Sequence, residues 1–112
     1  MAAATPLELT PQEVKSLQQS GKPLSFIDVR EPDEWVLAKI EGATLIPMGS
    51  VATNFQQIED KADEASLVVY CHHGVRSLQV VSWLRERGVV AYSMAGGIDR
   101  WSREIDSSVP LY

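Results

Sequence analysis

Short apolar runs recur from one end of the chain to the other, separated by polar residues, glycines or prolines. The run Leu67–Tyr70 is wholly apolar, which is typical of a central strand in a parallel sheet covered on both faces. The remaining runs are shorter and are bounded by turn residues, as strands usually are. They predict further strands at 7–10, 24–28, 44–46 and 89–93.

Signals for helix starts and helix ends lie between the predicted strands. Thr10 and Glu13 can form a capping box, and Pro11 suits the first position of a helix. Similar signals and apolar periodicity mark three more helices. The predicted helices run from Pro11 to about Ser20, from Pro32 over a short stretch, from Ser50 to about Ala62, and from Arg76 or Ser77 to Arg87.

Strands that alternate with helices imply right-handed crossovers between parallel strands. The predicted fold class is therefore α/β, with a mostly parallel sheet and helices on both faces. No repeat, linker or low-complexity tract divides the sequence, so we expect a single domain over residues 1–112. Sheets of this kind bind ligands beyond the carboxyl ends of their strands.

Composition narrows the class of function. Of the 112 residues, 45% are apolar and 22% are charged, as in an ordinary globular protein, and the formal net charge is -5. A negative balance argues against a nucleic-acid binder, whose affinity would depend on clustered Lys and Arg. Residues 1–10 show no basic leader followed by an apolar run, and no stretch is long enough to cross a bilayer. We therefore expect a cytoplasmic protein with neither nucleic-acid nor membrane partners.

Cys71 is the only cysteine, so the chain cannot form an internal disulfide. It lies between the predicted buried strand and the start of a helix, where unpaired N–H groups carry partial positive charge. Gly74 can adopt a positive φ and let successive amides curve around an anion. Such surroundings favour an ionised, reactive thiol. The alternative is that Cys71 serves only as a small buried apolar side chain.

The two histidines beside the cysteine leave two interpretations open. His72 and His73 either form a solvated loop face or give electrostatic help to an anionic sulfur. A metal site shared with Cys71 is disfavoured, because three consecutive residues rarely point at one ion and no second cluster has zinc-ligand spacing. We expect neither a metal nor a cofactor.

At this loop the sequence resembles the rhodanese family of sulfurtransferases, and three further stretches match in the same order. Agreement of four separate patterns in order and spacing makes the resemblance strong, and it covers nearly the whole chain. One departure is that Ala38 and Lys39 precede Ile40, where the family usually has Gly-His. The matching stretches are Cys71 to Ser77, Asp28 to Trp35, Ile40 to Pro47, and Gly96 to Trp101.

The resemblance implies a three-layer fold with a five-stranded sheet. It also implies that Cys71 accepts sulfane sulfur from a donor such as thiosulfate and passes it to a thiophilic acceptor. That acceptor would be cyanide, a thiol or a protein, and we expect the enzyme to be a monomer. The residues expected to bind the transferred sulfur are His72, His73, Gly74, Val75, Arg76 and Ser77.

The resemblance also suggests roles around the loop. Asp28 is expected to face Arg76 and brace the loop, the alternative being a turn or helix-capping role. Arg30 is expected to be a surface charge. Gly96 and its neighbour are expected to form a tight turn near the loop, and Trp101 is expected to lie in the core.

Two other classes of function compete with a sulfurtransferase. Cysteine phosphatases share the fold class, but five residues separate their cysteine from their arginine, whereas four separate Cys71 from Arg76. No carboxylate beside the cysteine is available as a general acid for a departing alcohol. The second competitor is a non-catalytic binding module, since related domains occur without the cysteine.

Overall fold

The computed structural model of the protein describes residues 6–112. Residues 1–5, part of the segment in which no leader was expected, lie outside the described residues. Five strands form one sheet in the order β1-β5-β4-β2-β3, and every neighbouring pair is parallel. The predicted fold class is thereby confirmed. The strands are β1 (Glu8–Leu9), β2 (Leu24–Asp28), β3 (Thr44–Leu45), β4 (Ser66–Tyr70) and β5 (Ala91–Met94).

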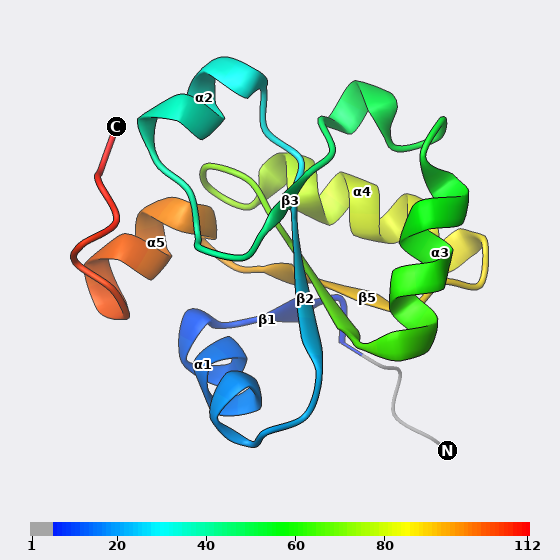
Figure 1. Ribbon diagram of the computed structural model, residues 1–112, viewed down its shortest axis with the longest axis horizontal. Coiled ribbons are helices and arrows are strands. Elements are labelled where there is room, and N and C mark those ends of the chain that lie inside the picture. The colour runs from blue at the N-terminus through cyan, green and yellow to red at the C-terminus, as the bar shows by residue number, and fades with distance from the viewer. Residues whose placement is uncertain (1–5) are drawn as a thin grey trace.

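Helices cover both faces of the sheet (Figure 1). The helices α1 and α5 pack on one face, where they share an apolar cluster with β2, β4 and β5. On the other face, α3 and α4 enclose a second cluster with the same central strands. Besides the short 3-10 helix η1 (Met48–Ser50), the helices are α1 (Pro11–Gln19), α2 (Pro32–Leu37), α3 (Phe55–Glu64), α4 (Val75–Glu86) and α5 (Gly97–Glu104).

Most of the predicted elements are present, and two differ. The capping box is confirmed, because Thr10 Oγ1 accepts from Glu13 N at 3.1 Å and Glu13 Oε1 accepts from Thr10 N at 2.8 Å. The helix expected from Ser50 begins later, since η1 and the turn through 51–54 take up its first residues. The helix α5 was not predicted, because its first residues were interpreted only as a glycine turn.

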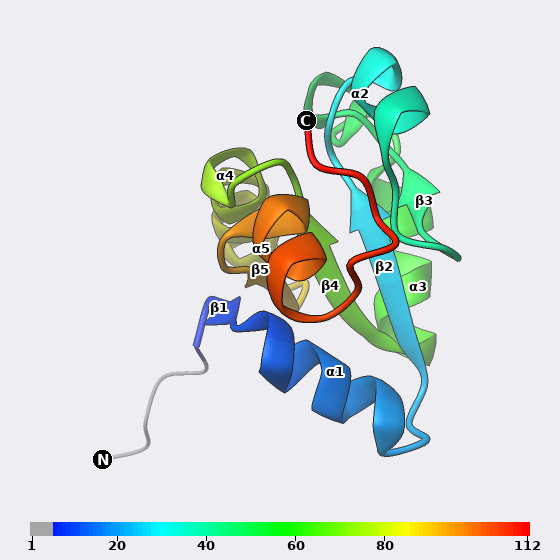
Figure 2. The same ribbon diagram turned by 90° about the vertical axis from the view of Figure 1, so that its left-hand side faces the viewer.

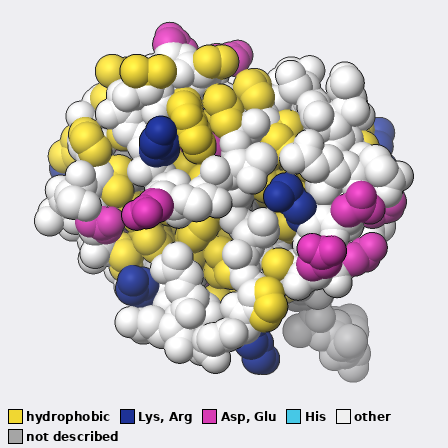
Figure 3. All heavy atoms as spheres, viewed as in Figure 1, with side chains coloured by type: hydrophobic (Ala, Val, Ile, Leu, Met, Phe, Trp, Pro, Cys, Tyr) yellow, Lys and Arg dark blue, Asp and Glu magenta, His cyan; other side chains and the backbone are white. Residues whose placement is uncertain are grey.

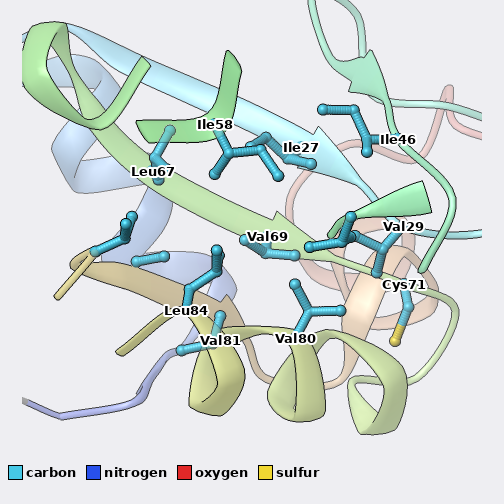
Figure 4. Close-up of a cluster of buried hydrophobic side chains, with 13 residues drawn as sticks. Ile27, Val29, Ile46, Ile58, Leu67, Val69, Cys71, Val80, Val81 and Leu84 are labelled. Carbon is cyan, nitrogen blue, oxygen red and sulfur yellow. The ribbon is translucent and has the colours of Figure 1, made fainter. Parts of the chain in front are cut away.

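The central strand β4 is the most deeply buried part of the sheet. Four consecutive residues, Leu67–Tyr70, are fully buried, and they alternate between the two apolar clusters. Figure 4 shows the cluster between the sheet and α4, with Cys71 at its edge, where β4 gives way to a loop. The core therefore fixes the end of β4 rigidly. Among the described residues, no helix is both long and apolar enough to cross a membrane.

Candidate active site

Cys71 directly follows β4, at the carboxyl end of the parallel sheet. Its side chain is only 1% exposed. The chain then turns through His72 and His73 to Gly74, the N-cap of α4, which has a φ of 103°. Because L side chains rarely adopt that φ, glycine is what allows the chain to turn back over the cysteine. In Figure 4 the sulfur of Cys71 points toward the first turn of α4.

Backbone amides surround the sulfur. Gly74 N donates to Cys71 Sγ at 3.1 Å, and Ser77 N donates to the same atom at 3.4 Å. The thiol in turn donates to Ser77 Oγ at 3.4 Å, and the hydroxyls of Ser77 and Ser93 share a hydrogen bond of 2.7 Å. Amides converging at a helix N-terminus form a cradle for one anionic atom. Two backbone amides therefore converge on Cys71 Sγ, in the arrangement expected of an anion cradle.

A second glycine turn supports this loop from behind. Ile98 N donates to Cys71 O at 2.9 Å, and Asp99 N donates to His72 O at 3.1 Å. Gly97 has a φ of 61°, and a Cβ at this position would lie 2.4 Å from His72 O. The start of α5 therefore fits against the loop only because Gly97 has no side chain, and the predicted tight turn near the loop is confirmed.

Arg76 does not pair with Asp28, and that prediction was wrong. Its guanidinium forms a bidentate ion pair with Glu34 of α2, with Nη1–Oε1 at 2.7 Å and Nη2–Oε2 at 3.0 Å. The hydrogen bonds from Arg76 lower the pKa of Glu34 to about 2, and they raise the pKa of Arg76. The charge of Cys71 also contributes to the raised pKa of Arg76. The spacing of residues could not indicate Glu34 as the partner of Arg76, because only folding brings α2 next to the loop.

Asp28 instead holds Arg30, which lies two residues further along the chain. Arg30 Nε donates to Asp28 Oδ1 at 2.9 Å, and Arg30 Nη2 donates to Oδ2 at 2.6 Å. Both side chains are 0% exposed, so the expectation that Arg30 is a surface charge was also wrong. Arg30 Nη2 also donates to Ala38 O, at the C-terminal end of α2, at 2.5 Å.

The C-terminal segment completes the site, and sequence reasoning missed it. Figure 2 shows this segment running from α5 to α2. The Tyr112 hydroxyl donates to Glu34 Oε2 at 2.8 Å and accepts from Arg30 Nη1 at 2.8 Å. Its ring stacks on His72, with centroids 3.9 Å apart and an interplanar angle of 9°. No local pattern around a single tyrosine could have indicated these contacts.

The two histidines lie side by side at the surface of the loop. Burial, and then the neighbouring His73, lower the pKa of His72 below its ordinary value of 6.5. A neutral His72 offers no full positive charge to the sulfur, and its buried Nε2 has no hydrogen-bond partner among the described residues. His73 is exposed. The solvated-face interpretation therefore fits His73 better than His72.

Together with Asp99, the histidines bring three groups with ligand atoms within 4.8 Å of one another. Their arrangement does not suit a metal ion. The rings of His72 and His73 are 3.8 Å apart and tilted by 31°, so their in-plane lone pairs do not converge on one point. Asp99 Oδ2 already accepts from Arg103 Nε at 3.0 Å.

Exposed apolar side chains lie on α2 and at the start of α4. Val75, the first residue of α4, is 67% exposed, and Val36 of α2 is 82% exposed. Figure 3 shows hydrophobic side chains gathered over α2, where Leu37 is also exposed. Trp101, in contrast, is buried as predicted and makes an edge contact with Phe26, with ring centroids 5.8 Å apart.

The all-parallel sheet and the cysteine loop between its central strand and α4 agree with the family resemblance found in the sequence. Residues 10–104 match the model of the rhodanese-like domain family, and the chain belongs to that family. A rhodanese-like domain protein from Staphylococcus aureus has the same fold, with a TM-score of 0.78 at 28% identity. The match covers 94% of this chain and 97% of that one.

Two curated relatives carry more specific names. Thiosulfate sulfurtransferase GlpE of Haemophilus influenzae is 35% identical over 98 residues, which cover 86% of this chain and 88% of GlpE. The probable adenylyltransferase/sulfurtransferase MoeZ of Mycobacterium tuberculosis is 32% identical over 111 residues. That match covers 98% of this chain but only 28% of MoeZ, so the chain spans little more than a quarter of this larger relative.

Proposed function

We propose that the protein is a sulfurtransferase that carries sulfane sulfur as a persulfide on Cys71. The donor would be a small molecule such as thiosulfate, and the acceptor would be cyanide, a thiol or a protein. The observation that carries the proposal is the cradle in which Gly74 N and Ser77 N both donate to Cys71 Sγ. The name of the relative GlpE supports thiosulfate as a donor.

The reaction would take place in two displacements at sulfur. The Cys71 thiolate attacks the sulfane sulfur of thiosulfate, a new S–S bond forms, and the donor's S–S bond breaks with its electron pair leaving on sulfite. Cyanide then attacks the outer sulfur of the persulfide. That S–S bond breaks, its electron pair returns to Cys71, and thiocyanate leaves. Charge and atoms balance without any further reactant.

The loop is organised to hold the anions that this cycle requires. Both the thiolate and the persulfide are negatively charged, and the amides of Gly74 and Ser77 are fixed before either one forms. Because Cys71 is the only cysteine of the chain, no second thiol within it can attack the persulfide. The loaded enzyme should therefore persist until an outside acceptor arrives.

Intact-mass measurement tests this proposal. We expect wild-type protein treated with thiosulfate to gain the mass of one sulfur atom and to lose it when cyanide is added. Cys71→Ser should gain no sulfur and should transfer none from thiosulfate to cyanide, while its thermal melt shows that the fold is kept.

Two results would contradict the proposal. If no sulfane donor adds sulfur to the wild-type protein, the binding-module interpretation takes its place. If aryl phosphates are instead hydrolysed in a Cys71-dependent manner, the protein is a phosphatase despite the four-residue spacing between Cys71 and Arg76.

A further inference from the structure

The positive charges around the Cys71 loop are compensated by carboxylates. Arg76 is held bidentately by Glu34, and Arg30 is held by Asp28. On α5, whose first turn supports the loop, Arg103 Nε pairs with Asp99 Oδ2 at 3.0 Å. Each of these three arginines is therefore paired with a carboxylate within residues 6–112, and none of the three presents an unpaired charge to an incoming anion.

Glu34 is fixed in its position by three groups besides its own helix. The two nitrogens of Arg76 occupy both of its oxygens, and the hydroxyl of Tyr112 adds a third hydrogen bond at 2.8 Å. The backbone N of Glu31 donates to Glu34 Oε1 at 3.1 Å. The side chain is only 18% exposed, so water competes weakly for these contacts. The carboxylate cannot swing away from Arg76 without losing all of them.

We infer that Glu34 determines specificity at this site by selecting singly charged sulfur donors over doubly charged ones. The inference rests on the proposed function, because it concerns the step that loads Cys71. The amides of Gly74 and Ser77 stabilise one anionic sulfur. The leaving half of a donor stays outside that cradle, beside the entrance, since Cys71 is almost completely buried.

A second negative charge on the leaving half would meet the Glu34–Arg76 pair rather than a free guanidinium. Arg76 directly precedes Ser77, whose amide donates to Cys71 Sγ at 3.4 Å, so the net charge of Arg76 bears on any anion bound there. Removing one unit charge about 8 Å from another, at an effective dielectric constant of about 60, changes a rate about threefold. Neutralising Glu34 should therefore favour the dianion by about that factor.

Two donors of matched chemistry isolate the second charge. Thiosulfate is a dianion that loses sulfite, and methanethiosulfonate is a monoanion that loses methanesulfinate. In both, the Cys71 thiolate attacks the sulfane sulfur, and the S–S bond breaks with its electron pair on the departing sulfur group. The loading reaction is quenched at successive times and the added sulfur is measured by intact mass, at one pH for both donors and all variants.

Glu34→Gln removes the charge of Glu34 but keeps its length and one acceptor oxygen. We expect the second-order rate of loading by thiosulfate to rise about threefold relative to that by methanethiosulfonate. Added salt should reduce this gain, because free charges near the surface are screened. The matched control is Asp33→Asn, which removes the same charge one residue away at an exposed position that does not touch Arg76. It should change the ratio of the two donors by clearly less than Glu34→Gln does, because an exposed charge further from the site is screened more strongly.

The outcomes separate this inference from the proposed function. If both donors load Cys71 but Glu34→Gln leaves the donor ratio unchanged or lowers it, Glu34 is a structural partner of Arg76 and the inference is wrong. The same holds if Asp33→Asn raises the ratio as much as Glu34→Gln does. If neither donor loads the wild-type protein, the proposed function fails, and the inference fails with it.

Discussion

Arg30 shows how a charged residue can be buried completely in a small protein. Each nitrogen of its guanidinium group has a partner. Nε and Nη2 donate to the carboxylate of Asp28, and Nη2 also donates to Ala38 O. Nη1 donates to Glu34 O and to the hydroxyl of Tyr112. Asp28 supplies the opposite charge from the end of β2. A buried charge is tolerated only when it is paired and hydrogen-bonded in this way. Arg30 thus connects β2, the chain around α2 and the C-terminal segment.

Asp28→Ala should destabilise the protein by about 3 to 5 kcal/mol, because it leaves a buried guanidinium without its carboxylate. Denaturant unfolding measures this loss. Asp33→Asn removes an exposed charge from the first turn of α2 but keeps the Oδ1 that accepts from Glu34 N, so it should cost less than about 1 kcal/mol and serves as the control. A similar small loss for Asp28→Ala would mean that the buried pair contributes little to stability.

The residues of the loop could be predicted from the sequence, but their partners could not. Cys71, Gly74 and Ser77 lie within one continuous motif, so their mutual geometry follows from the strand, the glycine and the helix start. Pairing between distant residues is different. From the sequence, Asp28 could pair with Arg30, two residues away, or with Arg76 of the cysteine loop. Only the position of α2 in the folded chain brings Glu34 to Arg76 and leaves Asp28 to pair with Arg30.

At the scale of elements, the site depends on two loops that pack backbone against backbone. The loop after β4 and the turn before α5 are joined by hydrogen bonds from Ile98 N and Asp99 N. A Cβ at Gly97 would lie 2.5 Å from Cys71 O, and one at Gly74 would lie 3.1 Å from Gly96 N. Each loop therefore keeps the other in its conformation.

Gly97→Ala should disrupt this contact. Gly88→Ala is the matched control, because Gly88 also has a positive φ, 81°, but nothing lies within 4 Å of a Cβ placed there. The control should lose roughly 1 to 2 kcal/mol, the cost of the left-handed conformation alone. Gly97→Ala should lose clearly more in a denaturant melt, and it should load sulfur on Cys71 more slowly. Equal losses of unfolding free energy in the two variants would show that the close approach of the loops does not contribute to stability.

Elements were predicted best where the signal was local. The strand β2 and the start of α1 follow from turn residues and a capping box, and both match the structure. The helix α5 was missed because Gly97 occupies its first position, and a glycine pair usually indicates a turn. The start of α3 was misplaced because a 3-10 turn and an α-helix have similar local patterns.

At the scale of the whole molecule, the Glu34–Arg76 pair fastens α2 to α4 across the carboxyl end of the sheet. The folded protein holds the pKa of Glu34 at about 2, below the ordinary value of 4.5. A group whose pKa is lower in the folded state stabilises the fold above its unfolded pKa, and that contribution disappears as the pH falls through the folded pKa.

The difference in unfolding free energy between wild type and Glu34→Gln should therefore be largest above pH 4.5 and should shrink as the pH falls toward 2. Denaturant melts over this range measure it. Other acidic groups titrate in both proteins, so their contributions cancel in the difference. A difference that does not vary with pH would mean that the charge of Glu34 does not contribute to the stability of the folded protein.

The two edge strands of the sheet, β1 and β3, contain only two residues each. A long exposed edge offers a row of free N–H and C=O groups to which another chain can add a strand. Edges this short offer very few, so the sheet is poorly suited to extension by a neighbouring molecule. A protein that docked over the Cys71 loop would instead have to recognise side chains, and the exposed Val75 at the start of α4 is one of them.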